Sequence, residues 1–158
     1  MKKFELTSEF VTFLGKTLFR IKALVSFGDV AEGELGGFIE RENNLDQSGD
    51  AWVYGDAQVY GYAQVSGNAQ VCGDARVYGD AWVQNCRDYS ATSCFGSENR
   101  TTTFFRTKDG GISVRCGCFY GTLREFREKV KERHGDSRLA KEYLMLADLM
   151  EFRLSKDE

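Results

Sequence analysis

The stretch Gly49-Asp-Ala-Trp-Val-Tyr-Gly-Asp-Ala-Gln-Val-Tyr60 begins an array of six-residue units that continues to Gln84. Three columns of the array never vary: glycine at 49, 55, 61, 67, 73 and 79, alanine two residues after each glycine, and valine two residues after each alanine. Residues two apart point to the same side of a strand, so alanine and valine share one side. Glycine followed by Asp or Asn indicates a turn. Each unit therefore predicts a short strand and a corner, with alanine and valine facing inward.

The array resembles the hexapeptide-repeat family of left-handed β-helices. In that family an aliphatic residue is followed four positions later by a small one, as Val53 is followed by Ala57 here. The resemblance implies that three units form one 18-residue coil. Residues 49–84 are then expected to form a short left-handed parallel β-helix of two coils.

An 18-residue coil also predicts which side chains lie above one another. Tyr78 is expected above Tyr60, Arg76 above Gln58, Gln70 next to Trp52 and Trp82 next to Gln64. Exposed aromatic residues on a flat face favour a subunit interface over a ligand platform. We expect this interface to contain Trp52, Tyr60, Tyr78 and Trp82.

Two coils leave open ends and flat faces that need to be covered. The sequence therefore predicts an oligomer, and the family resemblance favours a trimer or a multiple of it. Before the array, residues 1–48 are expected to form an N-terminal β cap. The alternating residues 16–24 predict a strand that pairs with 10–14 around Gly15, and residues 33–45 predict an irregular first coil.

After the array, residues 85–158 predict a C-terminal ββαα module. Residues 101–107 and 112–120 have strand character, with a turn at 108–111. Thr122 and Glu125 form a capping box that begins a helix. A last helix follows, with a predicted apolar stripe of Leu139, Tyr143, Leu146, Leu149 and Met150. The predicted fold class is mainly β.

Charge is distributed unevenly along the chain. Net charge is −3, but residues 28–84 contain ten acids and two bases, whereas residues 85–135 contain ten bases and six acids. The basic segment suggests an anionic partner, although an ordinary solvated surface explains it as well. Our candidate ligand-binding residues are Arg106, Lys108, Arg115 and Tyr120, because the predicted hairpin carries bases beside aromatic residues. The sequence pI of 5.3 argues against a nucleic-acid partner.

Few residues in the sequence suggest catalysis. Hexapeptide acyltransferases use a histidine as a general base, and the chain has one histidine, His134, after the array. A histidine at a helix C-terminus is more often a favourable partner of the helix dipole. We therefore predict no catalytic residue and no cofactor.

The cysteines are the candidate zinc ligands, and the N-terminus is where an export signal would lie. A zinc site formed by Cys86, Cys94, Cys116 and Cys118 stays open, but structural zinc usually uses Cys-x₂₋₄-Cys pairs, so no metal site is predicted. The fifth cysteine is Cys72. We expect reduced thiols and a cytoplasmic protein, since no export signal or membrane segment is evident.

The segments Gly15-Lys-Thr-Leu-Phe-Arg-Ile-Lys-Ala23, Leu35-Gly-Gly-Phe-Ile-Glu40 and Cys116-Gly-Cys-Phe-Tyr-Gly-Thr-Leu123 resemble small uncharacterised proteins of bacteria and their phages. This resemblance implies a genomic context and no activity. We expect a non-enzymatic, oligomeric binding protein, in concrete terms a phage-type inhibitor of a bacterial defence system. Such an inhibitor would bind a defence protein or sequester a nucleotide signal. The alternatives are a hexapeptide-type acyltransferase and a structural assembly module.

Overall fold

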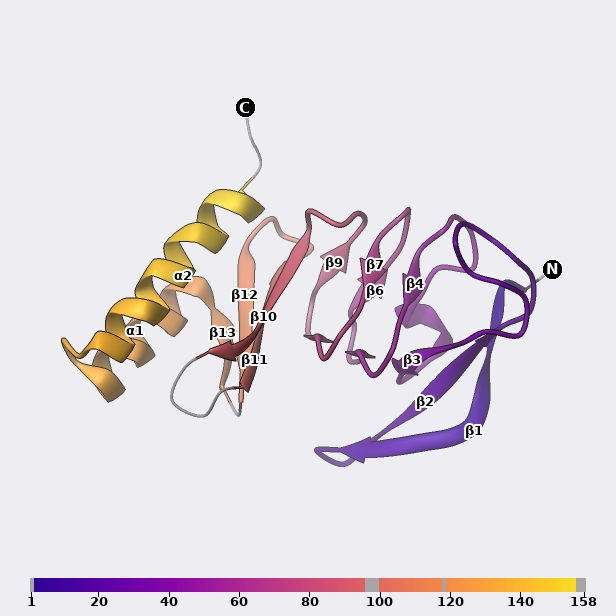
Figure 1. The fold of residues 1–158 in the computed structure, drawn as a ribbon, viewed down its shortest axis with the longest axis horizontal. Coiled ribbons are helices and arrows are strands. Elements are labelled where there is room, and N and C mark those ends of the chain that lie inside the picture. The colour runs from indigo at the N-terminus through magenta and orange to yellow at the C-terminus, as the bar shows by residue number, and fades with distance from the viewer. Residues whose placement is uncertain (1, 96–99, 118, 156–158) are drawn as a thin grey trace. The chain divides into compact units, whose positions relative to one another are not determined.

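The computed structural model describes residues 2–95, 100–117 and 119–155. The chain divides into two compact units, Met1–Cys86 and Arg87–Glu158. The first unit contains the repeat array, and the second contains a sheet and two helices (Figure 1). The predicted start of the C-terminal module at residue 85 lies two positions before this division.

The repeat array consists of short parallel ladders between strands that lie 18 residues apart. Val53 pairs with Val71, Val59 with Val77, and Val65 with Val83. The alanine and valine columns are buried along the whole array. The expected vertical neighbours are confirmed. The six strands have two residues each: β4 (Trp52–Val53), β5 (Gln58–Val59), β6 (Gln64–Val65), β7 (Gln70–Val71), β8 (Arg76–Val77) and β9 (Trp82–Val83).

The corner glycines adopt backbone angles that other residues avoid. Gly67 has φ +65°, and a Cβ placed there would overlap the carbonyl oxygen of Gln84. Gly73 has nearly the same φ, +66°, but a Cβ there would meet no atom within 4 Å. Both positions therefore favour glycine because of the backbone angle, and Gly67 also has no room for a Cβ.

An irregular coil precedes the array, as expected. Strand β3 (Leu35–Ile39) pairs in parallel with β5, and Leu45 forms a parallel bridge with Val65. Between β3 and Leu45, Glu42–Asn44 forms a short 3-10 helix, η1. Buried Asn44 donates a 2.9 Å hydrogen bond to the carbonyl of Ala63. This coil therefore gives the first repeats hydrogen-bond partners on the side that faces the N-terminal segment.

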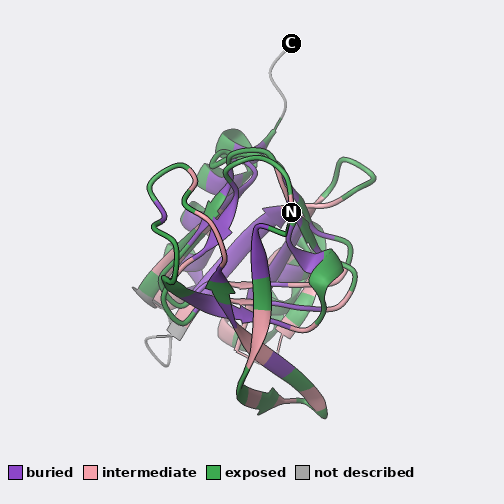
Figure 2. Ribbon diagram, turned by 90° about the vertical axis from the view of Figure 1, so that its right-hand side faces the viewer, coloured by how far each residue is buried: buried purple, intermediate pink, exposed green. Residues whose placement is uncertain are grey.

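An antiparallel hairpin extends the sheet at this end. Strand β1 (Phe4–Phe13) pairs with β2 (Lys16–Ala23), and β2 pairs with β3, giving the order β1-β2-β3-β5-β8. The predicted hairpin around Gly15 is confirmed, with a first strand longer than expected. Strand β1 buries only Phe4, whereas β2 buries Leu18, Ile21 and Ala23, and the hairpin end is exposed (Figure 2).

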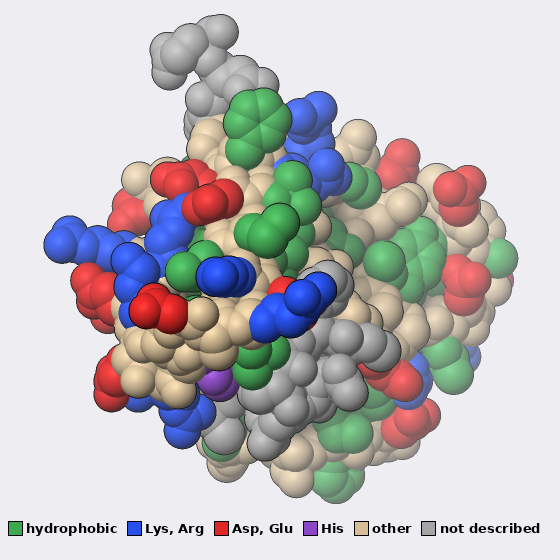
Figure 3. Space-filling view, turned by 60° about the vertical axis from the view of Figure 1, so that its left-hand side comes forward, with side chains coloured by type: hydrophobic (Ala, Val, Ile, Leu, Met, Phe, Trp, Pro, Cys, Tyr) green, Lys and Arg blue, Asp and Glu red, His purple; other side chains and the backbone are tan. Residues whose placement is uncertain are grey.

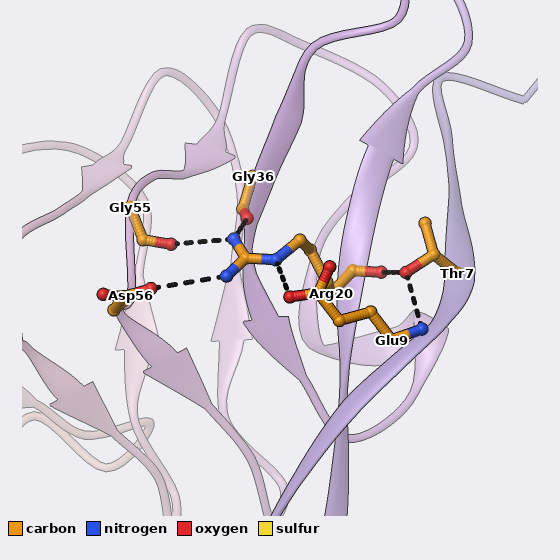
Figure 4. Close-up of polar contacts among 6 residues, drawn as sticks. All are labelled: Thr7, Glu9, Arg20, Gly36, Gly55 and Asp56. Carbon is orange, nitrogen blue, oxygen red and sulfur yellow. Dashed lines mark hydrogen bonds and ion pairs between the residues drawn. The ribbon is translucent and has the colours of Figure 1, made fainter.

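Arg20 on β2 joins the hairpin to the coils (Figure 4). Its guanidinium lies 2.8 Å from Glu9 Oε2, 2.6 Å from the carbonyl oxygen of Gly36 and 3.4 Å from Asp56 Oδ1. The same group lies 4.3 Å from the centroid of the Phe38 ring. The hydrogen bond to Glu9 is the largest cause that raises the pKa of Arg20. Three segments distant in sequence are thus held by one planar side chain.

The expectation that Trp52 and Tyr60 are exposed is wrong. Both point outward from the array, as the alternation requires, but their exposed fractions are 0% and 1%. The rings of Phe4 and Phe27 cover Trp52, and Phe13 packs edge-on against Tyr60. The hairpin and the segment after it occupy these faces. Tyr78 is partly buried, and Trp82 stays 38% exposed.

The second unit contains a four-stranded antiparallel sheet and two helices. Its strands, in the order β10-β11-β12-β13, are β10 (Tyr89–Phe95), β11 (Arg100–Arg106), β12 (Ile112–Cys116) and β13 (Phe119–Thr122). The helices are α1 (Leu123–His134) and α2 (Arg138–Leu154). The sequence predicted two strands here. It missed β10 and treated β12 and β13 as one strand, although Gly117, with φ +59°, separates them.

The capping box of the first helix is confirmed. Glu125 N donates to Thr122 Oγ1 at 3.1 Å, and Thr122 N donates to Glu125 Oε1 at 2.9 Å. One face of the sheet packs on the helices: Phe104 and Val114 share a core with Phe126 of α1 and Leu146 of α2.

Candidate functional site

Helix α2 begins at a serine cap and buries one face against α1 and the sheet. Ser137 Oγ accepts a 3.2 Å hydrogen bond from the backbone N–H of Ala140. The buried side recurs every three or four residues, which is the period of one helix face. Its members are Ala140, Tyr143, Leu146, Ala147, Met150 and Leu154.

The opposite side of α2 carries a second apolar row, which we call the outer row: Met145, Leu149 and Phe152. Their exposed fractions are 71%, 56% and 81%. The spacing of four and then three residues places them on one line along the helix. At about 100° per residue, this line lies opposite the buried face. Figure 3 shows hydrophobic side chains on this side of the unit, with acidic and basic side chains around them.

Charged residues flank the outer row at both ends and along one side. Glu142 lies 4.0 Å from Arg138 near the beginning of α2, and Arg153 is exposed near its end. Alongside, Arg127 of α1 donates to Asp148 at 2.8 Å and to Glu151 at 2.7 Å. Burial alone lowers the pKa of Arg127, but the two carboxylates outweigh it and raise that pKa. An apolar centre with a charged rim is the composition of a protein interface.

The sequence analysis did not identify the outer row. It placed Leu149 in the buried stripe with Leu146 and Met150, but Leu149 is exposed on the other side. That assignment is wrong because Leu149 is 56% exposed. At about 100° per residue, it lies more than 100° around the helix from the middle of the buried face. The spacing of Met145, Leu149 and Phe152 was the signal that could have revealed the row.

The four predicted ligand-binding residues do not share one surface. Arg115 and Tyr120 are paired across β12 and β13, and Tyr120 stacks on Phe105 with ring centroids 6.3 Å apart. Arg115 is only 4% exposed. Because Arg115 follows Val114 on its strand, this pair lies on the sheet face opposite the helices.

Arg106 and Lys108 lie elsewhere. Arg106 is on the helix side of the sheet, where it donates to the carbonyl of Leu154 at 2.5 Å and pairs with buried Asp88 at 3.1 Å. Lys108 lies exposed in the turn between β11 and β12. Arg106 therefore ties α2 to the sheet, and the predicted cluster is not assembled.

The one histidine of the chain lies at a helix end, and the described cysteines differ in exposure. His134 ends α1, and its ring stacks on Tyr143 with centroids 5.7 Å apart. Cys116 accepts a hydrogen bond from Thr102, whereas Cys72 and Cys86 are exposed. Cys118 and the side chain of Cys94 lie outside the described residues. Within the described part of the chain, no three His, Cys, Asp or Glu side chains are grouped to hold a metal ion.

Comparison with known proteins supports the repeat assignment. Residues 69–85 match a family model described as the YdcK beta solenoid repeat. The comparison with curated proteins gave no match. Among the described residues, no helix is long and apolar enough to cross a membrane. The chain is thus a mainly β protein with a β-solenoid-type repeat and a C-terminal two-helix module.

Proposed function

We propose that this chain is a non-enzymatic, oligomeric binding protein that associates with another protein chain through the outer row of α2. The observation that carries the proposal is the exposure of Met145, Leu149 and Phe152 on the side of α2 opposite its core. Contiguous exposed apolar side chains with a polar rim mark protein interaction sites. Met and Phe are also enriched in interfaces.

The array serves this function as a rigid scaffold. We propose that it is a left-handed, hexapeptide-type β-helix, on the basis of the three invariant columns and the 18-residue pairing of Val53 with Val71. Its remaining exposed aromatic residues, Trp82 and Tyr62, lie on or beside the strands β6 and β9. This face is the one we propose for contacts between arrays, in a trimer or a multiple of it.

The partner that we propose is a protein of a bacterial defence system, following the resemblance to small phage proteins. A nucleotide signal is a weaker candidate, because Arg106 is held by Asp88 and Leu154 and Arg115 is almost fully buried. Acyl transfer is weaker still, since a base must reach the substrate proton and His134 packs on Tyr143.

The test uses the full chain as bait in bacterial lysates, with L149E/F152E as the variant and Leu35→Glu as the matched control. Leu35 is 54% exposed in the first unit, close to the 56% of Leu149, so both changes put a carboxylate on an exposed leucine. A protein retained by the wild type and by Leu35→Glu but lost by L149E/F152E supports the proposal. Equal retention by all three overturns it.

Native mass spectrometry of the untreated protein addresses the ligand directly. We expect an oligomer without added small mass. A bound mass in the nucleotide range would replace the protein partner by a sequestered signal.

A further inference from the structure

The outer row is continued by charges of opposite sign. Glu142 precedes the row and Arg153 follows it, and both are exposed on α2. They are eleven residues apart, so they lie within about 20° of each other around the helix axis. The helix thus shows, on one side of an apolar line, an acid near its beginning and a base near its end.

We propose that the outer row pairs with the outer row of a second copy of this chain, with the two α2 helices antiparallel about a two-fold axis. This inference rests on the proposed function, because it takes the outer row as a protein-binding face. A second copy occupies that face when no defence protein is bound, so the two compete for it. A two-fold axis brings identical surfaces together, so the face must be complementary to itself. The charges on α2 meet this requirement only in one orientation.

The antiparallel orientation follows from the positions of the two charges. In a parallel pair, the two-fold axis runs along the helices and places each residue and its copy at the same height on opposite sides of the contact, so Glu142 meets no Arg153. In an antiparallel pair centred between Ala147 and Asp148, Glu142 of one copy stands opposite Arg153 of the other. The two-fold axis keeps both residues on the same side of the contact, so their charges meet.

The same centre interlocks the apolar side chains. At a rise of about 1.5 Å per residue, Met145 of one copy falls between Leu149 and Phe152 of the other. This is the knob-and-hole relation of antiparallel helices. Asp148 comes near the axis in both copies, where like charges would repel. Its carboxylate is already paired with Arg127 of its own chain at 2.8 Å, which offsets that repulsion.

Three side chains a copy make a small interface, so the pair is expected to be weak and dependent on concentration. Pairing through α2 also doubles whatever assembly the arrays form. A monomer becomes a dimer, and a trimer becomes a hexamer.

The first experiment is light scattering and sedimentation of the full chain over a range of concentrations. We expect an even number of 17.8 kDa chains for the wild type at high concentration. L149E/F152E should have half that mass at every concentration, and Leu35→Glu should match the wild type. An odd-numbered wild-type assembly, or an unchanged mass for L149E/F152E, overturns the inference.

A charge exchange tests the orientation. Glu142→Arg and Arg153→Glu should each weaken association by about tenfold, which corresponds to a typical loss on breaking a close interface charge pair. The double exchange E142R/R153E should restore association, because the pair is re-formed with reversed signs. If the double exchange is as weak as the single ones, the antiparallel register is wrong.

These outcomes separate the inference from the proposed function. If the wild type stays monomeric but a lysate protein is lost only by L149E/F152E, the outer row binds a foreign protein and self-pairing is wrong. If L149E/F152E changes neither self-association nor capture, both fail.

Discussion

Tyr78 lies directly above Tyr60, with ring centroids 4.5 Å apart and ring planes only 9° from parallel. The two tyrosines are one 18-residue coil apart, so this stack reports the period of the array. Phe13 of the hairpin packs edge-on against Tyr60, with centroids 5.9 Å apart. The stack therefore links two successive coils to the segment that covers them.

The two rings of the stack should contribute unequally to the free energy of unfolding, with the larger contribution from Tyr60. Tyr60 is 1% exposed, whereas Tyr78 is only partly buried. Tyr60→Ala should reduce the free energy of unfolding by about 3–5 kcal/mol, the range for deleting a buried aromatic ring. Tyr78→Ala should cost about 2 kcal/mol, since it loses less buried area. Urea denaturation of both variants tests this order. Equal losses would contradict the claim that Tyr60 is more deeply buried than Tyr78.

A matched pair of glycines separates backbone strain from lack of space. Gly67→Ala and Gly73→Ala both place a side chain at a φ near +65°, which costs about 1–2 kcal/mol. Only Gly67→Ala also forces a Cβ onto the carbonyl of Gln84, an overpacking cost of about 1–3 kcal/mol. In thermal unfolding, Gly67→Ala should therefore have a lower melting temperature than Gly73→Ala. The reverse order would contradict the close contact between Gly67 and Gln84.

The shape of the Arg20 side chain should matter as well as its charge. Arg20→Lys keeps the charge but loses the fork that reaches Glu9, Gly36 and Asp56 together. We expect a loss of about 1–2 kcal/mol in the free energy of unfolding. The exposed Arg41→Lys should change it by less than about 0.5 kcal/mol. Equal losses for Arg20→Lys and Arg41→Lys in urea denaturation would show that the shape of the Arg20 side chain does not matter.

Stability should depend on pH through Glu40. Burial raises the pKa of this carboxyl, but the backbone N–H of Gly61, Lys16 and Arg41 outweigh burial and lower it. A lowered pKa in the folded state means that the carboxylate stabilises the fold above its ordinary pKa of about 4.3. That contribution is lost as pH falls through the lowered value.

The test compares Glu40→Gln with the wild type at two pH values. The glutamine keeps an acceptor for Gly61 N–H and removes the charge. The variant should be less stable by about 1 kcal/mol at pH 7, and the difference should shrink towards pH 3. A difference that is constant with pH would assign the effect to packing.

Periodicity predicted the interior of the array well and its exterior poorly. The alternation in each unit tells which side of a strand Trp52 and Val53 occupy, and the structure follows it. It does not tell what lies outside, and Phe4 and Phe27 come from segments 25 to 48 residues away to cover Trp52. Long-range contacts of this kind have no local pattern in the sequence.

The candidate site shows the same limit in the second unit. The outer row of α2 and its buried face are both apolar, so a single stripe through Leu146, Leu149 and Met150 seemed sufficient. Only the packing of α2 on Phe126 and Val114 shows which residues are in the core. The predicted ligand-binding residues are divided between two faces for a related reason, because adjacent strand residues such as Phe105 and Arg106 point to opposite faces.

The 18-residue register determines which changes in length preserve the vertical pairing of the array. Duplicating three units would lengthen it by one coil and keep every column intact, with Tyr78 still stacked on a tyrosine or its copy. Inserting a single unit would move each following residue to the next ladder, so Val77 would no longer lie over Val59. Gene duplications in steps of 18 residues are thus the neutral ones, and an engineer can set the height of the scaffold one whole coil at a time.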